Sequence, residues 1–323
     1  MKSSKNLFIV TQAILGFIII VLICLMLMEN SGDSRDKISV VVSNSNDSQW
    51  AAFKYGLKRA AKDKDAKLVV VSSTGSLLTV EEEKRILEEE IENGADVLIV
   101  QPPVGEGAEE MLEEIARKVP VILVESGLQG EGDSGFPIVE PDNYMLGKSL
   151  AEELLKDYNG NVEGKTFGIL LETEDSEAVM ERKEGFCDAL NDAAEGVIWT
   201  ASSPSEESGD AVGNKFPVDF VIALDNSSFT KAGEASAARD LHGALVYGIG
   251  NSMEAVYYLD TGSAECLIVP DEFGVGYQSL TEAVDNLTFH FDRKRGQTLS
   301  YAVLRRETLF SEENQELIFT MSQ

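Results

Sequence analysis

Residues 39–56 read SVVVSNSNDSQWAAFKYG, a β-branched run followed by a polar turn and then a helical pattern. The run predicts a strand buried on both faces, because apolar and polar residues do not alternate in it. The helix after it begins near Trp50. In an open α/β sheet, ligands bind beyond the carboxyl ends of the strands. The polar turn is therefore a candidate part of a binding site.

Short apolar runs and amphipathic stretches alternate along the chain from residue 38 onward. This alternation predicts a doubly wound α/β architecture with parallel sheets. A break at residues 138–143, IVEPDN, divides the pattern into two loosely similar halves. We therefore expect two Rossmann-like lobes with a hinge and a ligand cleft between them. The strand candidates are residues 38–43, 68–73, 97–100, 121–124, 166–171, 197–201, 220–224, 245–249 and 267–269.

The composition is strongly acidic. The 323-residue chain has 56 Asp and Glu against 27 Lys and Arg, which gives a formal net charge of −29. A field of this sign repels phosphate backbones, so we expect no nucleic-acid partner. The apolar share of 43% is that of a globular protein.

The N-terminus contains a mostly apolar segment, residues 7–28, preceded by Lys2 and Lys5. Its length suits a helix that crosses a bilayer, which needs about 20 residues, and exceeds the core of a secretory signal peptide. Because the basic residues precede it, we expect a single-pass anchor with residues 1–28 comprising a cytoplasmic tail and the span. Residues 29–37 would be a linker, and the remaining chain would lie outside the cell membrane.

The residue patterns of enzymes and metal sites are missing from the sequence. His242 and His290 are the two histidines, and neither has a Cys, Ser or acid at a catalytic spacing. The sequence has no G-x-S-x-G, Walker or H-E-x-x-H motif. Cys187 and Cys266 are too far apart in sequence to form a metal or redox motif. We expect no enzymatic activity and no cofactor.

Six segments in order resemble the type I periplasmic sugar-binding proteins, the ribose-binding-like group, whose fold is shared by the ligand domains of lactose-repressor-like regulators. The segments are KISVVVSNSNDSQWAAFKYGLKRAA (37–61), NGADVLIVQPP (93–103), KVPVILVES (118–126), PDNYMLGKSLAEEL (141–154), MERKEGFCDAL (180–190) and FPVDFVIALDN (216–226). The resemblance implies a hinge that the chain crosses three times. The implied N-terminal lobe is residues 38–140 and 272–298, the C-terminal lobe is 141–271 and 299–310, and 311–323 form a short tail.

The resemblance also implies a set of ligand-binding residues. Trp50 stands at an aromatic position where the family stacks a ring on the sugar, and an indole suits the C–H face of a pyranose. The alternative is that Trp50 packs on its own lobe. Polar groups would hold the sugar hydroxyls. The full candidate set is Asn46, Asp47, Gln49, Trp50, Gln101, Glu125, Arg182, Asp225, Asn226 and Asn251.

Several positions depart from the family pattern. Ser126 and Met180 replace basic residues, Gly250 replaces an Asp, and Gln49 replaces an aromatic residue. In IVPDEF the usual Gln is missing, and Asp271 and Glu272 stand nearby. These departures make ribose itself an unexpected ligand. The aligned cleft is acid-rich, with Asp47, Glu125 and Asp225 and with Glu207 as a further candidate. The cleft would bind an amino sugar or another cationic solute, or else bind weakly.

We expect a membrane-tethered, extracytoplasmic solute-binding protein that takes a sugar-like molecule. Its partner would be the membrane permease of an ABC-type uptake system. The alternative is a sensing accessory that presents the ligand to the ectodomain of a two-component sensor kinase. A transcription regulator with this lobe fold would need a helix-turn-helix where this chain has the apolar segment.

Overall fold

The computed structural model describes residues 35–71, 79–125, 135–202, 212–288 and 296–323. The chain divides into two compact units, Met1–Asp36 and Lys37–Gln323. The apolar segment predicted to cross a membrane, residues 7–28, lies outside the described residues. Within the described part, no helix is both long and apolar enough to span a bilayer.

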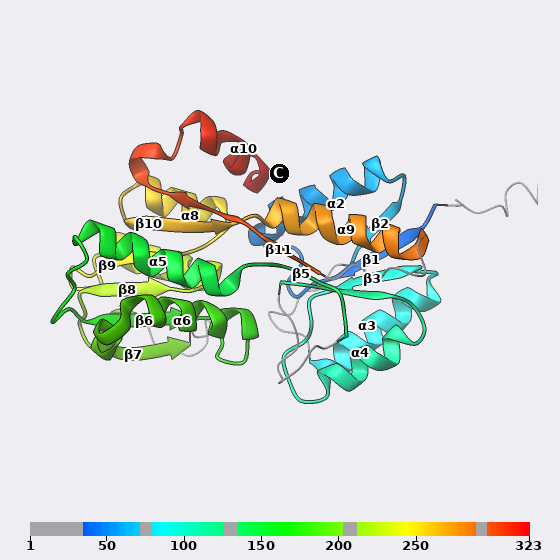
Figure 1. Ribbon diagram of the computed structural model, residues 1–323, viewed down its shortest axis with the longest axis horizontal. Coiled ribbons are helices and arrows are strands. Elements are labelled where there is room, and N and C mark those ends of the chain that lie inside the picture. Colours follow the sequence, from blue (N-terminus) through cyan, green and yellow to red (C-terminus); the bar gives the residue numbers. More distant parts are fainter. Residues whose placement is uncertain (1–34, 72–78, 126–134, 203–211, 289–295) are drawn as a thin grey trace, which may run out of the picture. The chain divides into compact units, whose positions relative to one another are not determined.

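The Lys37–Gln323 unit contains two six-stranded sheets (Figure 1). Sheet A has the order β11-β5-β4-β3-β1-β2 and all its strand pairs are parallel. Its strands are β1 (Lys37–Val41), β2 (Lys67–Val70), β3 (Val97–Val100), β4 (Val121–Val124), β5 (Ile138–Pro141) and β11 (Gln297–Leu299). β3 and β4 are wholly buried apolar runs, and β1 is buried from Ile38 onward, as strands covered on both faces must be.

Sheet B has the order β12-β10-β9-β8-β6-β7 and is parallel except for its edge strand β12, which is antiparallel to β10. Its strands are β6 (Phe167–Leu171), β7 (Val197–Ser202), β8 (Phe220–Ala223), β9 (Leu245–Ile249), β10 (Cys266–Pro270) and β12 (Tyr301–Leu304). Both sheets therefore have the same doubly wound strand order. The order in which strands are added to the sheet reverses beside β1 in sheet A and beside β6 in sheet B. The predicted α/β architecture with parallel sheets in two similar halves is confirmed.

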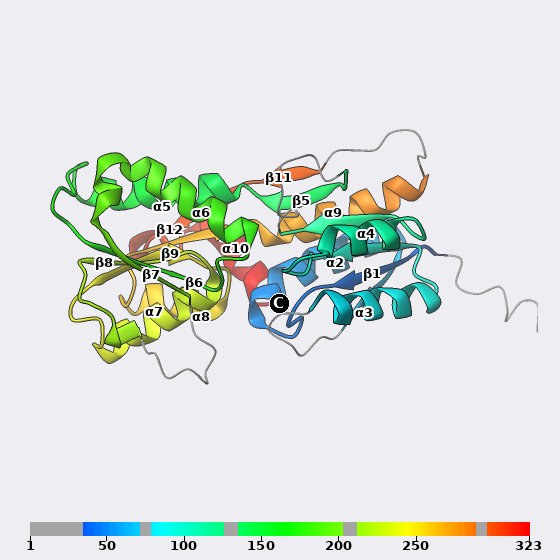
Figure 2. The same ribbon diagram turned by 90° about the horizontal axis from the view of Figure 1, so that it is seen from below.

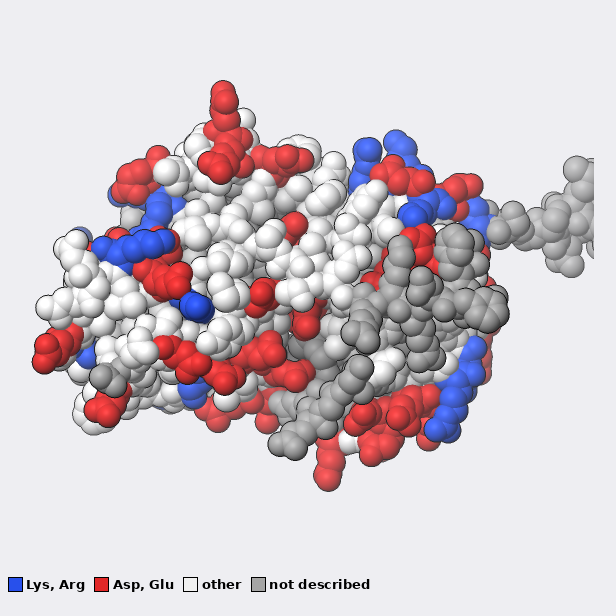
Figure 3. Space-filling view, in the orientation of Figure 1, with Lys and Arg blue, Asp and Glu red and all other residues white. Residues whose placement is uncertain are grey.

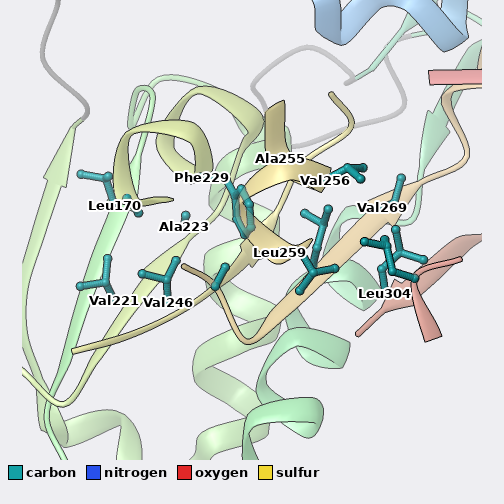
Figure 4. Close-up of a cluster of buried hydrophobic side chains, with 14 of the residues drawn as sticks. Leu170, Val221, Ala223, Phe229, Val246, Ala255, Val256, Leu259, Val269 and Leu304 are labelled. Atoms are coloured by element: carbon teal, nitrogen blue, oxygen red, sulfur yellow. The ribbon is translucent and has the colours of Figure 1, made fainter. Parts of the chain in front are cut away.

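Helices cover both faces of each sheet. In sheet A, α2 and α9 pack on one face, and α3 and α4 on the other. In sheet B, α5 and α6 cover one face, and α7, α8 and α10 the other, where the core shown in Figure 4 lies. The helices are α2 (Ala51–Asp63), α3 (Val80–Glu92), α4 (Ala108–Ala116), α5 (Asn143–Asp157), α6 (Glu177–Leu190), α7 (Asn226–Ala238), α8 (Met253–Asp260), α9 (Glu272–Thr288) and α10 (Glu312–Met321). Short 3-10 turns are η1 (Ser48–Trp50), η2 (Asn191–Gly196), η3 (Val212–Asn214) and η4 (Arg306–Thr308).

Local signals in the sequence explain where several helices begin and end. Thr79 and Glu82 form a reciprocal capping box at the start of α3, and the side chain of Asp142 caps α5. Gly94 and Gly160 have positive φ angles of 82° and 77° just beyond α3 and α5, as predicted for helix stops.

The chain passes between the sheets three times: after β5, after β10, and between β11 and β12. The last passage is the shortest, because Ser300 alone separates the two strands. The exact lobe boundaries stay a prediction. The C-terminal tail expected at 311–323 contains the helix α10, which lies against α2 in both views (Figures 1 and 2).

Two helix pairs make unusually close contact through glycine. In α2 and α9, a methyl group on Gly56 would collide with the carbonyl of Phe273, and one on Gly276 with the carbonyl of Phe53. In α5 and α6, Gly147 faces the carbonyl of Arg182, and Gly185 that of Tyr144. In each half, one helix of the pair follows the first strand of the sheet: α2 follows β1, and α6 follows β6. The other helix, α9 or α5, follows a passage of the chain between the sheets. These contacts set the position of α6 and α9, which carry pocket residues.

Candidate ligand-binding site

A pocket of about 100 Å³ lies where the carboxyl ends of strands from both sheets converge. Its walls come from the segments after β1, β3 and β4 of sheet A and after β6, β8 and β9 of sheet B. It therefore includes the points where the strand order reverses in each sheet, the usual ligand position in doubly wound folds. The lining residues are Gln49, Trp50, Gln101, Glu125, Glu172, Ser176, Ala178, Val179, Arg182, Asp225, Asn226, Ile249, Gly250, Asn251, Pro270 and Glu272.

Eight of the ten residues predicted from the sequence line this pocket, and Asn46 and Asp47 do not. Asn46 is exposed. The Asp47 carboxylate instead accepts a hydrogen bond from the Gln49 amide at 3.0 Å and so caps η1. The polar turn in the 39–56 segment therefore has a structural role and a pocket role. Asp47 caps η1, and the next residues, Gln49 and Trp50, line the pocket. A ligand contact by Asn46 or Asp47 stays a prediction, and Glu207 lies outside the described residues.

Trp50 lines the pocket, yet only 4% of its surface is exposed. Its indole Nε1 donates to the Ser43 carbonyl at 3.0 Å, and its ring meets Phe53 edge-on at a centroid distance of 5.4 Å. Most of the indole therefore packs within the core of sheet A. Trp50 thus both lines the pocket and packs in the core of sheet A. Its role as a platform for a sugar ring stays a prediction.

Amide side chains join the two sheets at the pocket. Gln101 is fixed by the Ser43 amide, which donates to its Oε1 at 3.0 Å. The Asn251 Nδ2 donates to the Gln49 carbonyl at 3.2 Å, and its backbone amide donates to the Asn226 Oδ1 at 3.1 Å. The bond from Asn251 to Gln49 links the segment after β9 to the segment after β1. Both residues line the pocket.

Arg182 supplies the positive charge of the pocket lining. Its side chain is buried in the first turns of α6, where Nε donates to the Asn143 Oδ1 at 2.9 Å and Nη1 to the Leu224 carbonyl at 3.1 Å. Asn143 in turn donates to the Glu125 carbonyl at 3.3 Å. These two acceptors are uncharged, and the Arg182 charge opposes the rise that burial causes in the pKa values of Glu172, Asp225 and Glu272.

Asp225 is the most fully bonded acid of the pocket. It accepts hydrogen bonds from the Ser228 amide and hydroxyl, each at 2.8 Å, and from the Glu172 amide at 2.7 Å. It thereby caps α7 and joins β8 to the end of β6. Burial nonetheless raises the pKa of this carboxyl. Asp225 is at once a structural cap and a pocket residue.

Glu125 and Glu272 face the pocket with unsatisfied oxygens. Among the described residues, Glu125 Oε1, Asn251 Oδ1 and Glu272 Oε2 are buried and have no hydrogen-bond partner. Glu125 follows β4 in a left-handed conformation with φ of 72°, an uncommon state for a residue other than glycine. Burial raises the pKa of Glu272 well above its ordinary value, and the Glu125 carboxyl adds to this rise through its charge and through a hydrogen bond between the two side chains.

The prediction missed Glu172 and Ser176 in the pocket lining. Desolvation raises the pKa of Glu172 to about 7, with Asp225 adding to the rise, although the residue as a whole is exposed. The signal was present in the sequence, because Glu172 directly follows the apolar run of β6. The described residues contain no cluster of His, Cys, Asp and Glu arranged to hold a metal ion.

Comparison with known proteins places the fold in a family. The model of the periplasmic binding protein domain matches residues 38–290. The chain belongs to this family. The family resemblance inferred from the sequence is confirmed, and the family is one of binding proteins, in agreement with the expectation that the chain is not an enzyme. No curated protein sequence matches the chain.

Solved structures share the fold over most of this periplasmic binding protein. GanP, a glucose-galactose binding protein from Geobacillus stearothermophilus, has a TM-score of 0.72 at 18% identity and covers 86% of this chain and 99% of its own. A carbohydrate transporter solute-binding protein from Agrobacterium radiobacter, in complex with D-arabinose, has a TM-score of 0.75 at 18% identity over 88% and 99%. A XylFII–LytSN complex has a TM-score of 0.70 at 16% identity over 84% and 98%. At these identities the likeness shows the fold.

Proposed function

We propose that the protein is an extracytoplasmic solute-binding protein that captures a sugar-like small molecule between its two lobes. The observation that carries this proposal is the pocket formed by residues of both sheets, with three buried oxygens that lack partners among the described residues. Buried polar atoms are costly unless they are bonded, so a polar ligand that satisfies them is favoured.

The chemistry of the lining suits a polyhydroxylated ligand. Each hydroxyl both donates and accepts, and the pocket offers both kinds of partner. Carboxylates and amide oxygens accept, while the Arg182 guanidinium and the amide nitrogens donate. The sugars named for GanP and for the Agrobacterium protein support a monosaccharide as the ligand class.

Two roles are open to such a binder. Delivery to an ABC-type permease is supported by the Agrobacterium relative, described as a transporter solute-binding protein. Presentation to a sensor kinase is supported by the XylFII–LytSN complex, in which a protein of this fold binds a second protein. An uncleaved anchor at residues 7–28 would hold the binder beside one membrane partner, which agrees with either role. We assign uptake as the leading role and sensing as the alternative.

The test is a thermal-shift screen of the purified full-length chain against hexoses, pentoses and amino sugars. A ligand at a hundredfold its dissociation constant stabilises the folded state by about 2.7 kcal/mol, so the melting temperature should rise. Failure of every monosaccharide to raise it would remove sugar capture as the function. Protease treatment of intact cells checks the placement: residues 37–323 should be digested, and protection of this unit would place it inside.

A further inference from the structure

The pocket carries more negative charge than a neutral sugar requires. Four carboxyl groups line it, and Arg182 is the one basic residue among the lining residues, so three acids remain without a counter-charge there when all are ionised. The four acids are Glu125, Glu172, Asp225 and Glu272. Asp225 has its hydrogen bonds to Ser228 and to the Glu172 amide. The excess negative charge therefore belongs to Glu125, Glu172 and Glu272.

Glu125 and Glu272 form the core of this excess. They come from different elements, Glu125 from the end of β4 and Glu272 from the first position of α9. Only 2% of the Glu272 surface is exposed, and its Oε2 has no partner among the described residues. The Oε1 of Glu125 is also buried and has no hydrogen-bond partner among the described residues. The two carboxyl groups share a hydrogen bond, which requires one of them to carry a proton. A cation bound at this position would take the place of that proton.

We propose that the ligand is a monosaccharide bearing a protonated amino group, and that its ammonium binds between the carboxyl groups of Glu125 and Glu272. This rests on the proposed function as a sugar-binding protein. An ammonium has three N–H donors and no acceptor, which matches the acceptors present: the two carboxyls and the unpartnered Oδ1 of Asn251. The hydroxyls of the same sugar would meet Arg182 and Gln101.

Binding of the ammonium should expel a proton. Burial and the neighbouring Glu125 raise the pKa of Glu272, with Arg182 acting in the opposite sense and Asp271 adding to the rise. The hydrogen bond between the two carboxyl groups also needs a proton, so the pair favours the retained proton, whereas a bound cation favours its loss. A neutral sugar supplies no charge and leaves the proton in place. The two ligand classes thus differ in the number of protons released.

The experiment is isothermal calorimetry of the full-length chain at pH 7 with three matched sets: glucosamine, galactosamine and mannosamine, their neutral parent hexoses, and their N-acetyl derivatives. We expect at least one amino sugar to bind about tenfold or more tightly than both its parent and its N-acetyl form. Measurement in buffers of different ionisation enthalpy should show proton release to the buffer for the amino sugar and none for the parent.

The variant Glu272→Gln keeps the shape of the protonated acid, so it should fold and should lose the preference for the amino sugar. Glu316→Gln removes one exposed acid from α10 outside the pocket and controls for the change in net charge. It should retain the preference. A preference that survives in Glu272→Gln would overturn the assignment to this pair of acids.

The outcomes separate this inference from the proposed function. If a neutral hexose binds as tightly as its amino counterpart, the inference fails and sugar capture stands. If no member of any set binds, and no pentose binds in the thermal-shift screen, sugar capture and the inference fail together.

Discussion

At the residue scale, the acids of this chain are not all solvated surface groups, although red side chains are spread over the face in Figure 3. Glu140 on β5 is half-buried, and burial followed by the charges of Glu181 and Glu177 raises its pKa to about 7. An acid whose pKa is higher in the folded state than in the unfolded one binds its proton more tightly when folded. The free energy of unfolding therefore falls as pH rises between about 4.5 and 7 and stays lower above that range.

Replacement of Glu140 by Gln should remove this fall in the free energy of unfolding. The rise in pKa from 4.5 to about 7 corresponds to at most about 3 kcal/mol, and partial solvent access reduces it to about 1–2 kcal/mol. Urea unfolding should show Glu140→Gln more stable than the wild type at pH 8 and equal to it at pH 4. The exposed Glu152→Gln is the control and should follow the wild type at both pH values. Equal stability of Glu140→Gln and the wild type at pH 8 would contradict the assignment.

The sequence predicted those site residues that directly follow an apolar run or stand at a position where the family binds its ligand. Glu125 and Asp225 follow apolar runs, and both line the pocket. Asp47 follows one too, but its carboxylate caps η1, since a short acid next to free backbone amides serves as a cap. The pairing of Glu125 with Glu272 could not be read from the sequence. It depends on the packing of α9, almost 150 residues away along the chain.

At the element scale, the glycine contacts fix two helix pairs within the molecule. The nine strand candidates all became strands, because each buried apolar run is a local signal. β5, β11 and β12 were not among the candidates, since they are short and only partly buried. The close approach of α2 to α9 was not predictable, because Gly56 and Gly276 lie far apart in sequence and carry no periodic signal. Such a contact leaves no room for a side chain, since the packing partner is a backbone carbonyl.

Gly276→Ala tests this contact. Alanine favours an isolated helix by about 1 kcal/mol over glycine, but the added methyl would collide with the Phe53 carbonyl, and overpacking costs about 1–3 kcal/mol or more. Because the colliding atom belongs to the backbone and cannot rotate away, the cost should lie in the upper part of this range, and net destabilisation by about 1–2 kcal/mol is expected in denaturant unfolding. Gln278→Ala on the same helix, half-buried and two positions on, should change stability by less than about 0.5 kcal/mol. A Gly276→Ala variant as stable as the wild type would show that the helices can separate freely.

At the scale of the whole molecule, the C-terminal helix links the two halves through residues that do not line the pocket. The residues of α10 pack on the core of sheet B, while the Phe319 ring meets Tyr55 of α2 at a centroid distance of 6.0 Å. Tyr55 also contacts Phe273 at the start of α9. These aromatic contacts favour the arrangement of the two halves seen in the structure.

Phe319→Ala should weaken this link without removing a residue that lines the pocket. An aromatic pair contributes about 0.5–1.5 kcal/mol, so we expect ligand affinity to fall about two- to tenfold in calorimetry. Phe310→Ala removes a similarly exposed ring that has no aromatic contact within the described residues, and it should leave affinity unchanged. If both variants bind as the wild type does, α10 has no influence on closure.

The single residue between β11 and β12 has a consequence for the biogenesis of the protein. Neither sheet has its full set of strands until the ribosome has polymerised the final tenth of the chain, because β11 completes one and β12 the other. A nascent chain therefore cannot finish either half early. A premature stop before residue 297 would leave both halves incomplete at once.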